Sequence, residues 1–460
     1  MKEWVQQSLH VMAICLLPSF ALGADASPLI AWHSRIDIAS GRGERGPWQQ
    51  NESRYDYVDD PTVAIRDDGS VLVAWVDEAR KDVFIQRLSA NGTKQSDQPV
   101  NISRSPATFS WLPRVVLMPQ TPEYVYMLWQ EIIFSGGSHG GEIFFARSQD
   151  GGISFSQPIN LSNSVGGDGK GRINKSTWHN GSLDLIASAD GTLYAAWTEY
   201  DGQLWFSRST DYGETFSAPQ LVARDKDSPP ARAPALALAP DGTLYLAWTV
   251  GENNAADIHI SVSSDHGITF SRPRPVAQTK GYSDAPKLAT DRSGVLHLVF
   301  AESSGGPFER YQIHYTRSTD RARTFEPSRV ISKPAPRSTR SQGFPDLSLD
   351  GRGTLYVIWE LFPNLREHPR GLGMAISLDA GRNFTPPIVI PGSSDPMGGW
   401  NGSFQGLLMQ KLAVNNAGML AIVNSSLKEN ERSRVWLMRG QLSPGDTRQG
   451  TARSTSSLAQ

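Results

Sequence analysis

A short motif that recurs five times constrains the fold of this chain more than any other feature. Each copy has a Ser, an Asp two residues later and a Phe five residues after that Asp, and the copies are 54 to 61 residues apart. Their aspartates are Asp150, Asp211, Asp265, Asp320 and Asp379. A catalytic centre is needed only once, so a motif repeated at near-constant spacing predicts an architectural unit.

The chemistry of the motif is that of a turn. The Ser hydroxyl and the Asp carboxylate can form hydrogen bonds with backbone N–H groups of the same turn. Gly stands two residues after the Asp in four copies and supplies the positive φ that other residues avoid, whereas Ala322 takes this place in the fourth copy. We therefore predict that these Ser and Asp residues are structural.

A second pattern interlocks with the first. Segments such as DGSVLVAW, DGTLYAAW, DGTLYLAW and GTLYVIW combine a turn signal with a β-branched and aromatic run, which predicts a strand. An apolar stretch precedes each segment, and further strands flank the Asp turn that follows it. Four strands in a repeat of 50 to 60 residues are typical of a β-propeller blade.

The repeats predict an all-β protein with one propeller domain over residues 27–443. We count seven four-stranded blades, and six blades are the alternative. The first blade covers roughly 55–104, and the seventh, near 395–441, has only three strands. The segment PLIAWHSRIDI, residues 28–38, is expected to supply the missing strand, because closing the ring in this way removes an exposed sheet edge.

The N-terminal segment is typical of an exported protein. Lys2 precedes an apolar run, and small residues near Ala26 offer cleavage sites, which predicts a signal peptide over residues 1–26 and a bacterial periplasmic or secreted location. The run is short for a membrane span, so we expect no stable membrane insertion after cleavage. The only cysteine, Cys15, lies in this segment, so the mature chain would have no disulfide.

Charge and polarity limit the partners that the chain can have. The formal net charge is −2, so no basic field favours binding to nucleic acid or to an anionic membrane. The polar residues 444–460 are predicted to form a disordered tail. We predict no metal and no cofactor, since no local spacing of ligating residues is typical of a metal site.

The repeated S-x-D-x-G-x-T-F motif resembles the Asp-box, or BNR repeat, of sialidases and their relatives. The resemblance covers nearly the whole mature chain and implies a sialidase-like propeller. Sialidases hold the sugar carboxylate with three arginines, the first of them in an Arg-Ile-Pro motif. The matching place here reads Asp59-Asp60-Pro61, and Glu199 stands near the place of the second arginine. Carboxylates would repel an acidic sugar there, so we expect no sialidase activity.

The topology indicates where a ligand would bind. The loops that enter strand one and leave strand two share the face opposite the Asp turns, and propeller ligands usually bind over the central channel. Trp faces can stack on sugar rings, and neutral His or Tyr can move protons. Arg80 and Asp82 resemble remnants of the sialidase acid/base region. We predict catalytic roles for His179, Tyr200, Glu199 and Asp284, and ligand-binding roles for Trp111, His139, Trp178, Arg80, Asp82, Arg340, Trp400 and Asn401.

Each of these residues also has a structural interpretation. His179 can be a rim histidine that bonds a neighbouring loop, and the strand-end acids, Glu199 among them, can belong to the blade pattern. We expect the protein to bind or act on an extracellular glycan as a glycoside hydrolase-like propeller, which would need two carboxylates across the scissile bond. The alternatives are a non-catalytic scaffold that binds a protein or another ligand, and a polysaccharide lyase-like enzyme that uses His and Tyr.

Overall fold

The computed structural model describes residues 29–443 except for several short segments. These are 106–107, 134–140, 165–166, 168–169, 175–176, 181, 224–228, 252–255, 277–280, 308 and 403–409. The predicted signal peptide and C-terminal tail lie outside the described residues. The chain divides into a large compact unit, Trp32–Gln441, and a second one formed by Met1–Ala31, which includes most of β1 (Ile30–Trp32), and Leu442–Gln460.

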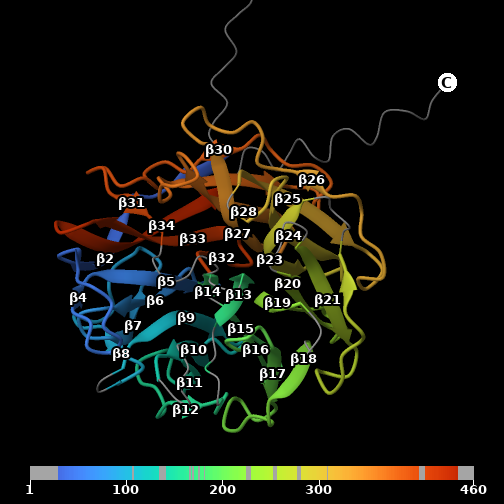
Figure 1. The fold of residues 1–460 in the computed structure, drawn as a ribbon, viewed down its shortest axis with the longest axis horizontal. Coiled ribbons are helices and arrows are strands. Elements are labelled where there is room, and N and C mark those ends of the chain that lie inside the picture. Colours follow the sequence, from blue (N-terminus) through green and yellow to red (C-terminus); the bar gives the residue numbers. More distant parts are fainter. Residues whose placement is uncertain are drawn as a thin grey trace, which may run out of the picture. The chain divides into compact units, whose positions relative to one another are not determined.

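Seven antiparallel sheets surround a central axis in the large unit, which confirms the seven-bladed propeller (Figure 1). Each of the first six blades has four consecutive strands, written here with the strand that lines the central channel first. Blade 1 contains β5 (Val58–Ile65), β6 (Val71–Asp77), β7 (Asp82–Leu88) and β8 (Val100–Asn101). Blade 2 contains β9 (Ser110–Leu117), β10 (Val125–Glu131), β11 (Glu142–Ser148) and β12 (Ile159–Asn160). Blade 3 contains β15 (Leu183–Ala187), β16 (Leu193–Thr198), β17 (Leu204–Ser209) and β18 (Gln220–Ala223).

The next three blades repeat this order. Blade 4 contains β19 (Ala231–Leu238), β20 (Leu244–Val250), β21 (Asp257–Ser263) and β22 (Arg274–Pro275). Blade 5 contains β23 (Tyr282–Thr290), β24 (Leu296–Ser303), β25 (Tyr311–Ser318) and β26 (Arg329–Val330). Blade 6 contains β27 (Ser341–Leu349), β28 (Leu355–Phe362), β29 (Leu372–Ser377) and β30 (Ile388–Val389). Two small hairpins lie outside the blades, β3 (Glu44–Arg45) with β4 (Tyr55–Asp56) and β13 (Lys170–Asn174) with β14 (Thr177–Asn180).

Blade 7 joins the two ends of the propeller. Its strands are β31 (Trp400–Asn401), β32 (Leu412–Val414), β33 (Met419–Lys428), β34 (Arg432–Leu442) and β2 (Ile36–Gly41). β2 pairs antiparallel with β34, with Ile36 opposite Leu437 and Gly41 opposite Ser433. The predicted N-terminal closing strand is therefore confirmed, although its pairing with β34 extends to Gly41, three residues beyond the predicted segment.

The Asp motif forms the turn between the third and fourth strands, as predicted. In blade 3, Ser209 Oγ donates a hydrogen bond to Asp211 Oδ1 at 2.7 Å, and the Thr215 N–H donates to the same oxygen at 2.9 Å. Gly213 has a φ of 80°, and a Cβ added there would lie 2.7 Å from the Phe145 ring of blade 2. The glycine thus serves both the turn and the close approach of the neighbouring blade.

Five channel-lining strands share a kink that the repeat pattern does not predict. In each, a non-glycine residue with a φ between 48° and 58° precedes a proline, and the pairing register with the second strand shifts there. Such a bulge changes which side chains face the channel, and proline leaves no N–H unsatisfied at the break in pairing. The five pairs are Asp60-Pro61, Leu112-Pro113, Ala233-Pro234, Ala285-Pro286 and Phe344-Pro345.

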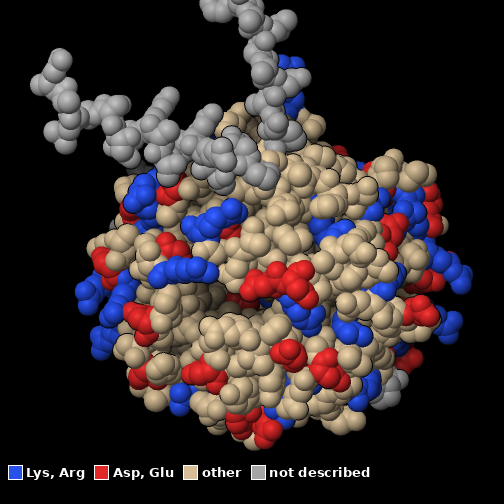
Figure 2. Space-filling view, turned by 180° about the vertical axis from the view of Figure 1, so that it is seen from behind, with Lys and Arg blue, Asp and Glu red and all other residues tan. Residues whose placement is uncertain are grey.

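Two surface properties bear on the search for a site. Figure 2 shows Lys and Arg interspersed with Asp and Glu over one face, with a hollow near its middle. In the part of the chain that the structure describes, no helix is long and apolar enough to cross a membrane.

Candidate functional site

The site predicted in blades 2 and 3 is described only in part. His139 lies outside the described residues. Trp178 and His179 belong to β14, where they pair with Arg172 and Gly171 of β13, and the structure describes their backbone alone. The proposed roles of these three side chains therefore remain predictions.

Glu199 and Tyr200 lie in the turn that follows β16. The Glu199 N–H donates to the Gln203 carbonyl, and the Tyr200 N–H donates to the Gly167 carbonyl, each at 2.8 Å. Burial raises the pKa of Glu199 above its usual range. A carboxyl group of this kind holds its proton to a higher pH, which suits a proton donor as well as a half-buried structural acid.

Trp111 cannot present a flat ring to a sugar, because Trp48 covers it. Trp111 is buried, its ring centroid lies 5.5 Å from that of Trp48, and Phe109 packs against both rings. Trp48 is 49% exposed and is the aromatic side chain that faces solvent here. It precedes the first blade, so the repeat pattern gave no reason to select it.

The blade 1 candidates, Arg80 and Asp82, have separate surroundings. Arg80 is exposed, and its Nε lies 3.6 Å from Asp77 Oδ2. Asp82 is buried and accepts hydrogen bonds from Ser103 Oγ at 2.6 Å and from the Ser105 N–H at 2.7 Å. Its carboxylate therefore fixes the loop that leaves β8.

Asp59 and Asp60, at the place of the sialidase arginine, are buried between blades. Ser425 Oγ of blade 7 donates to Asp59 Oδ1 at 2.7 Å, and the Leu112 N–H of blade 2 donates to Asp60 Oδ2 at 3.3 Å. Burial and the neighbouring carboxylates of Asp59 and Glu78 raise the pKa of Asp60. These acids therefore join blade 1 to blades 7 and 2, and they do not provide the positive charge that a sialidase arginine gives to its ligand.

Trp400 and Asn401 are also buried. The Trp400 ring stacks on His368 with a centroid distance of 4.1 Å and an interplanar angle of 17°. The Asn401 N–H donates to the Pro369 carbonyl at 2.7 Å, and its side-chain oxygen accepts from the Asp395 N–H at 3.3 Å. Both residues connect β31 to the loop after β28.

The remaining two candidates, Asp284 and Arg340, line adjoining cavities of blades 5 and 6. The first, of about 300 Å³, has Phe344, Phe362 and Tyr311 among its walls and Asp284 at one side. The two phenylalanine rings lie 5.9 Å apart at 59°. We call this cavity the aromatic pocket. Its full lining is Asp284, Ala285, Ala301, Pro307, Glu309, Tyr311, Ser341, Gly343, Phe344, Phe362, Asn364, Leu365 and Glu367.

The kinks in the channel-lining strands build this pocket. Phe344 and Ala285 both have a positive φ, and with Ala233 they form a small apolar cluster across blades 4, 5 and 6. The bulge at Phe344 changes which side chains of β27 face each side of the strand, and Phe344 lines the pocket. The sequence signal for this arrangement is the proline that follows each kinked residue.

Asp284 is held by groups from two blades. Its Oδ1 lies 3.4 Å from Arg232 Nε and accepts hydrogen bonds from Thr249 Oγ1 at 3.0 Å and from the Ala285 N–H at 2.8 Å. Arg232 is fully buried and donates further hydrogen bonds to the Gly251 carbonyl and to Tyr282 Oη, each at 2.5 Å. This network fixes one wall of the aromatic pocket.

Tyr311 lines both the aromatic pocket and the next cavity, and it does so as a neutral phenol. Its hydroxyl donates to the Pro307 carbonyl at 2.8 Å, and burial raises its pKa well above the usual range. A phenol with a raised pKa remains protonated at neutral pH and can serve a ligand as a polar or stacking surface.

Two further cavities share lining residues with the aromatic pocket. One, of about 550 Å³, shares Asn364, Leu365 and Glu367 with the aromatic pocket. The other, of about 630 Å³, shares Tyr311 with the aromatic pocket. Arg310 and Arg340 line both of these further cavities. We call the three cavities together the blade 5–6 groove.

The outer part of this groove is basic. Arg310, Lys333, Arg340 and Arg366 are exposed along it, and none forms an ion pair with a carboxylate in the described part of the chain. The described acids nearby are Glu309 and Glu367, and Glu367 already contacts Asn364 and Arg370. Positive charge without a protein partner favours an anionic ligand. Among the residues that the structure describes, no cluster of His, Cys, Asp and Glu is placed to hold a metal ion.

Comparison with known proteins finds one matching family model and several similar solved structures. The model of the BNR repeat-like domain matches residues 191–446. A protein of unknown function from Dyadobacter fermentans is 12% identical, with a TM-score of 0.51 over 91% of this chain and 100% of that one. The polysaccharide lyase Uly1 is also 12% identical, with a TM-score of 0.52 over 87% and 92% of the two chains. The Hadza microbial sialidase Hz136 is 18% identical, with a TM-score of 0.45 over 66% and 63%. No curated protein matches by sequence.

Proposed function

Because the chain belongs to the family of BNR repeat-like domains, whose sialidase-like propeller it shares, we propose that it is an exported protein that binds an extracellular glycan in the blade 5–6 groove. The observation that carries this proposal is that the aromatic pocket adjoins the basic outer cavities, with Tyr311, Asn364 and Leu365 in the shared walls. Sugar rings pack on aromatic faces, and a carboxylate or sulfate on the next sugar would meet the exposed arginines. The expected ligand is an acidic polysaccharide.

The surroundings of Asp284 favour binding over glycoside hydrolysis. A glycosidase needs one carboxyl group to give a proton and a second to act as base or nucleophile. Contacts from Arg232, Thr249 and the Ala285 N–H hold the Asp284 carboxylate at a fixed position. This arrangement suits a carboxylate that accepts hydrogen bonds from sugar hydroxyls better than one that donates a proton. The hydrolase and lyase activities are therefore tested as separate outcomes.

The experiment is a titration of the protein with uronic, sulfated and neutral polysaccharides by calorimetry. Wild type is compared with Phe344→Ala, with Arg340→Gln and with Arg272→Gln, a control at an exposed arginine outside the groove. Loss of the Phe344 ring is expected to weaken binding by about 1–3 kcal/mol. Arg340→Gln should weaken binding of acidic polymers only, and Arg272→Gln should leave every affinity unchanged. Added salt should weaken the binding of acidic polymers, because exposed charge pairs are screened.

Binding that is equal in all four proteins, or absent for every polymer, would show that the blade 5–6 groove is not the glycan-binding site. Enzyme activity is followed in the same samples through new reducing ends and through the ultraviolet absorbance of unsaturated uronates. Turnover that disappears in His179→Ala or Tyr200→Phe, without loss of binding, would favour the lyase-like function in blades 2 and 3.

A further inference from the structure

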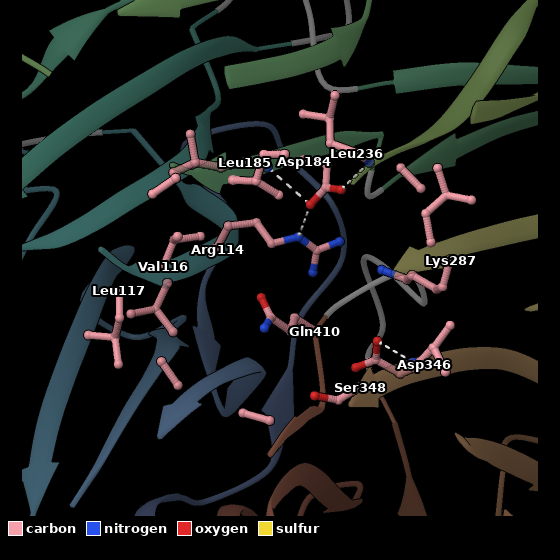
Figure 3. Close-up of a pocket in the computed structure, with 18 of the residues that line it drawn as sticks. Arg114, Val116, Leu117, Asp184, Leu185, Leu236, Lys287, Asp346, Ser348 and Gln410 are labelled. Carbon is pink, nitrogen blue, oxygen red and sulfur yellow. Dashed lines mark hydrogen bonds and ion pairs between the residues drawn. The ribbon is translucent and has the colours of Figure 1, made fainter. Parts of the chain in front are cut away.

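The charged side chains of the central channel balance one another. The channel contains a cavity of about 340 Å³ that is lined by residues from all seven blades. Figure 3 shows Arg114 beside Asp184 in this cavity, and Arg114 Nε lies 3.4 Å from Asp184 Oδ1. Burial raises the pKa of Asp346, and the positive charge of Lys287 opposes this rise. Because two carboxylates match the two cations, the charge of the channel is neutralised within the protein and gives no preference for an ionic ligand.

The aromatic pocket of the blade 5–6 groove differs from the channel, because its walls are mostly apolar. Phe344, Phe362 and Ala301 line it. Gly343 lines it too, and a Cβ added to Gly343 would lie 3.5 Å from the Phe362 ring, an ordinary contact distance. The missing side chain of Gly343 therefore leaves apolar space beside the Phe362 ring.

Blade 5 gives this pocket a hydrogen-bond acceptor. Asp284 lines the pocket, and its contacts with Arg232, Thr249 and the Ala285 N–H all fall on Oδ1. A carboxylate has acceptor sites on both oxygens, so Oδ2 can still accept from a ligand. The Arg232 guanidinium compensates the negative charge of Asp284, so a neutral N–H group suits this acceptor.

Blade 6 gives the pocket a hydrogen-bond donor. Ser341 lines the pocket and is 6% exposed, and its Oγ accepts from the Tyr311 N–H at 3.0 Å. A hydroxyl that accepts from the backbone keeps its own proton for donation. The pocket thus combines one acceptor, one donor and apolar space.

We propose that the aromatic pocket holds the acetamido group of an N-acetylated amino sugar. This inference rests on the proposed function and names the sugar that the groove selects. The acetamido N–H donates to Asp284 Oδ2, and the acetamido carbonyl accepts from Ser341 Oγ. The methyl group packs against the Phe362 ring beside Gly343. A sugar hydroxyl placed against these apolar walls would instead lose its hydrogen bonds to water.

The charges of the groove set the order of two neighbouring sugars. The aromatic pocket contains Asp284, Glu309 and Glu367, so a carboxylate or sulfate on the ligand would meet like charge there. Arg310 and Arg340 line both outer cavities. The ligand is therefore a polymer in which an acidic sugar, in the outer cavities, stands next to an acetamido sugar in the aromatic pocket.

The test compares polymers that differ only at the amide. Hyaluronan and unsulfated chondroitin, in which a uronic acid alternates with an N-acetylated amino sugar, are compared with the same polymers carrying formyl in place of acetyl. The formyl forms keep the amide and the charge but lack the methyl group. Calorimetry at constant ionic strength should show that the wild type binds at least one acetyl polymer about four-fold more tightly than its formyl form, the effect of burying one methyl group.

Variants of the pocket should change this preference. Gly343→Val fills the space beside Phe362, so it should abolish the preference for acetyl over formyl. Ser341→Ala removes the donor and should weaken binding of both forms by about three- to ten-fold. Ser293→Ala, at an exposed serine outside the groove, should leave every affinity unchanged. Should Gly343→Val not fold, loss of the preference in Phe362→Ala decides the question.

The outcomes separate this inference from the proposed function. Equal affinities of the wild type for acetyl and formyl polymers would overturn the inference. Binding of polygalacturonate, a uronic polymer without amides, combined with no binding of either acetyl polymer would overturn it too. In both cases the glycan-binding function stands if Arg340→Gln weakens the binding that is observed. Absence of binding by every polymer overturns both.

Discussion

Arg232 and Asp284 form a buried ion pair between blades 4 and 5, with Nε 3.4 Å from Oδ1 and side-chain exposures of 0% and 10%. The pair connects the starts of two channel-lining strands, and its Asp284 lines the aromatic pocket. Because a charge left alone in such a place has no water to compensate it, the two residues depend on each other.

Replacing Arg232 by Met should destabilise the fold strongly, by about 3–5 kcal/mol, since it leaves the Asp284 carboxylate without its cation. Arg321→Met is the matched control, because the Arg321–Asp241 pair is 2.7 Å long but exposed. The Arg321→Met variant should lose only about 0–1 kcal/mol in its free energy of unfolding. Urea unfolding of both variants measures the difference in their free energies of unfolding. Similar losses of stability in the two variants would show that burial does not determine how much these ion pairs contribute.

The Asp turns should make stability sensitive to acid. Hydrogen bonds from the Thr269 hydroxyl and N–H and from Ser263 Oγ lower the pKa of Asp265 to about 2. The pKa of Asp320 is lowered to about 2 in the same way. A carboxylate whose pKa is lower in the folded state stabilises the fold above its unfolded pKa, near 4, and this contribution is lost as the pH falls toward 2.

The Tm of wild type should therefore drop between pH 4 and pH 2. The Asp265→Asn variant should be less stable than the wild type at pH 7, and its Tm should fall less than that of the wild type between pH 4 and pH 2. Parallel pH profiles for the two proteins would mean that other groups dominate acid unfolding.

Closure by β2 should be required for a soluble ring. Deletion of residues 29–41 exposes the edge of β34, and we expect aggregation, because an unpaired strand edge pairs with other chains. Ile38→Ala, which opens a cavity at a buried position of β2, should cost about 2–4 kcal/mol and leave the ring closed. Light scattering during gel filtration and cooperative unfolding provide the measurement. A monomeric deletion variant that unfolds cooperatively would show that the ring closes without β2.

The protein should not release the fluorophore from a methylumbelliferyl sialoside. Two buried acids, Asp59 and Asp60, take the place that corresponds to the first sialidase arginine, and they bond to neighbouring blades instead of holding a sugar carboxylate. An active sialidase serves as the positive control. Release above background that is abolished by Arg80→Ala would show that an arginine site exists in blade 1.

The repeat pattern was sufficient to predict the blades but not the kinks within them. Strand and turn positions follow from alternating apolar residues and from the Asp motif, because the same local physics acts in every copy. The kinked residues are different, since a residue before proline usually adopts an extended conformation. The proline after each kinked residue marks the position, but it does not by itself predict the positive φ observed at Phe344 and Leu112.

The repeat pattern gave candidate loops for the site but no test of them. Asp284 and Arg340 line adjoining cavities of blades 5 and 6, and their functional roles stay predictions. Trp48 and Arg232 were missed for physical reasons. Trp48 precedes the first repeat and covers Trp111 through tertiary packing, and a buried arginine cannot be distinguished from an exposed one in an isolated sequence.

The pairing of β2 with β34 also determines when the molecule can be complete. Ile36 and Leu437 lie near opposite ends of the propeller sequence and meet in one sheet. During synthesis, β2 emerges before the first six blades, and its sheet partner β34 is made only after them. Contacts of such long sequence separation form slowly, because the loop between them must close first. The chain therefore carries an open edge for most of its synthesis, and completion of the ring is expected to be the last and rate-limiting step of folding.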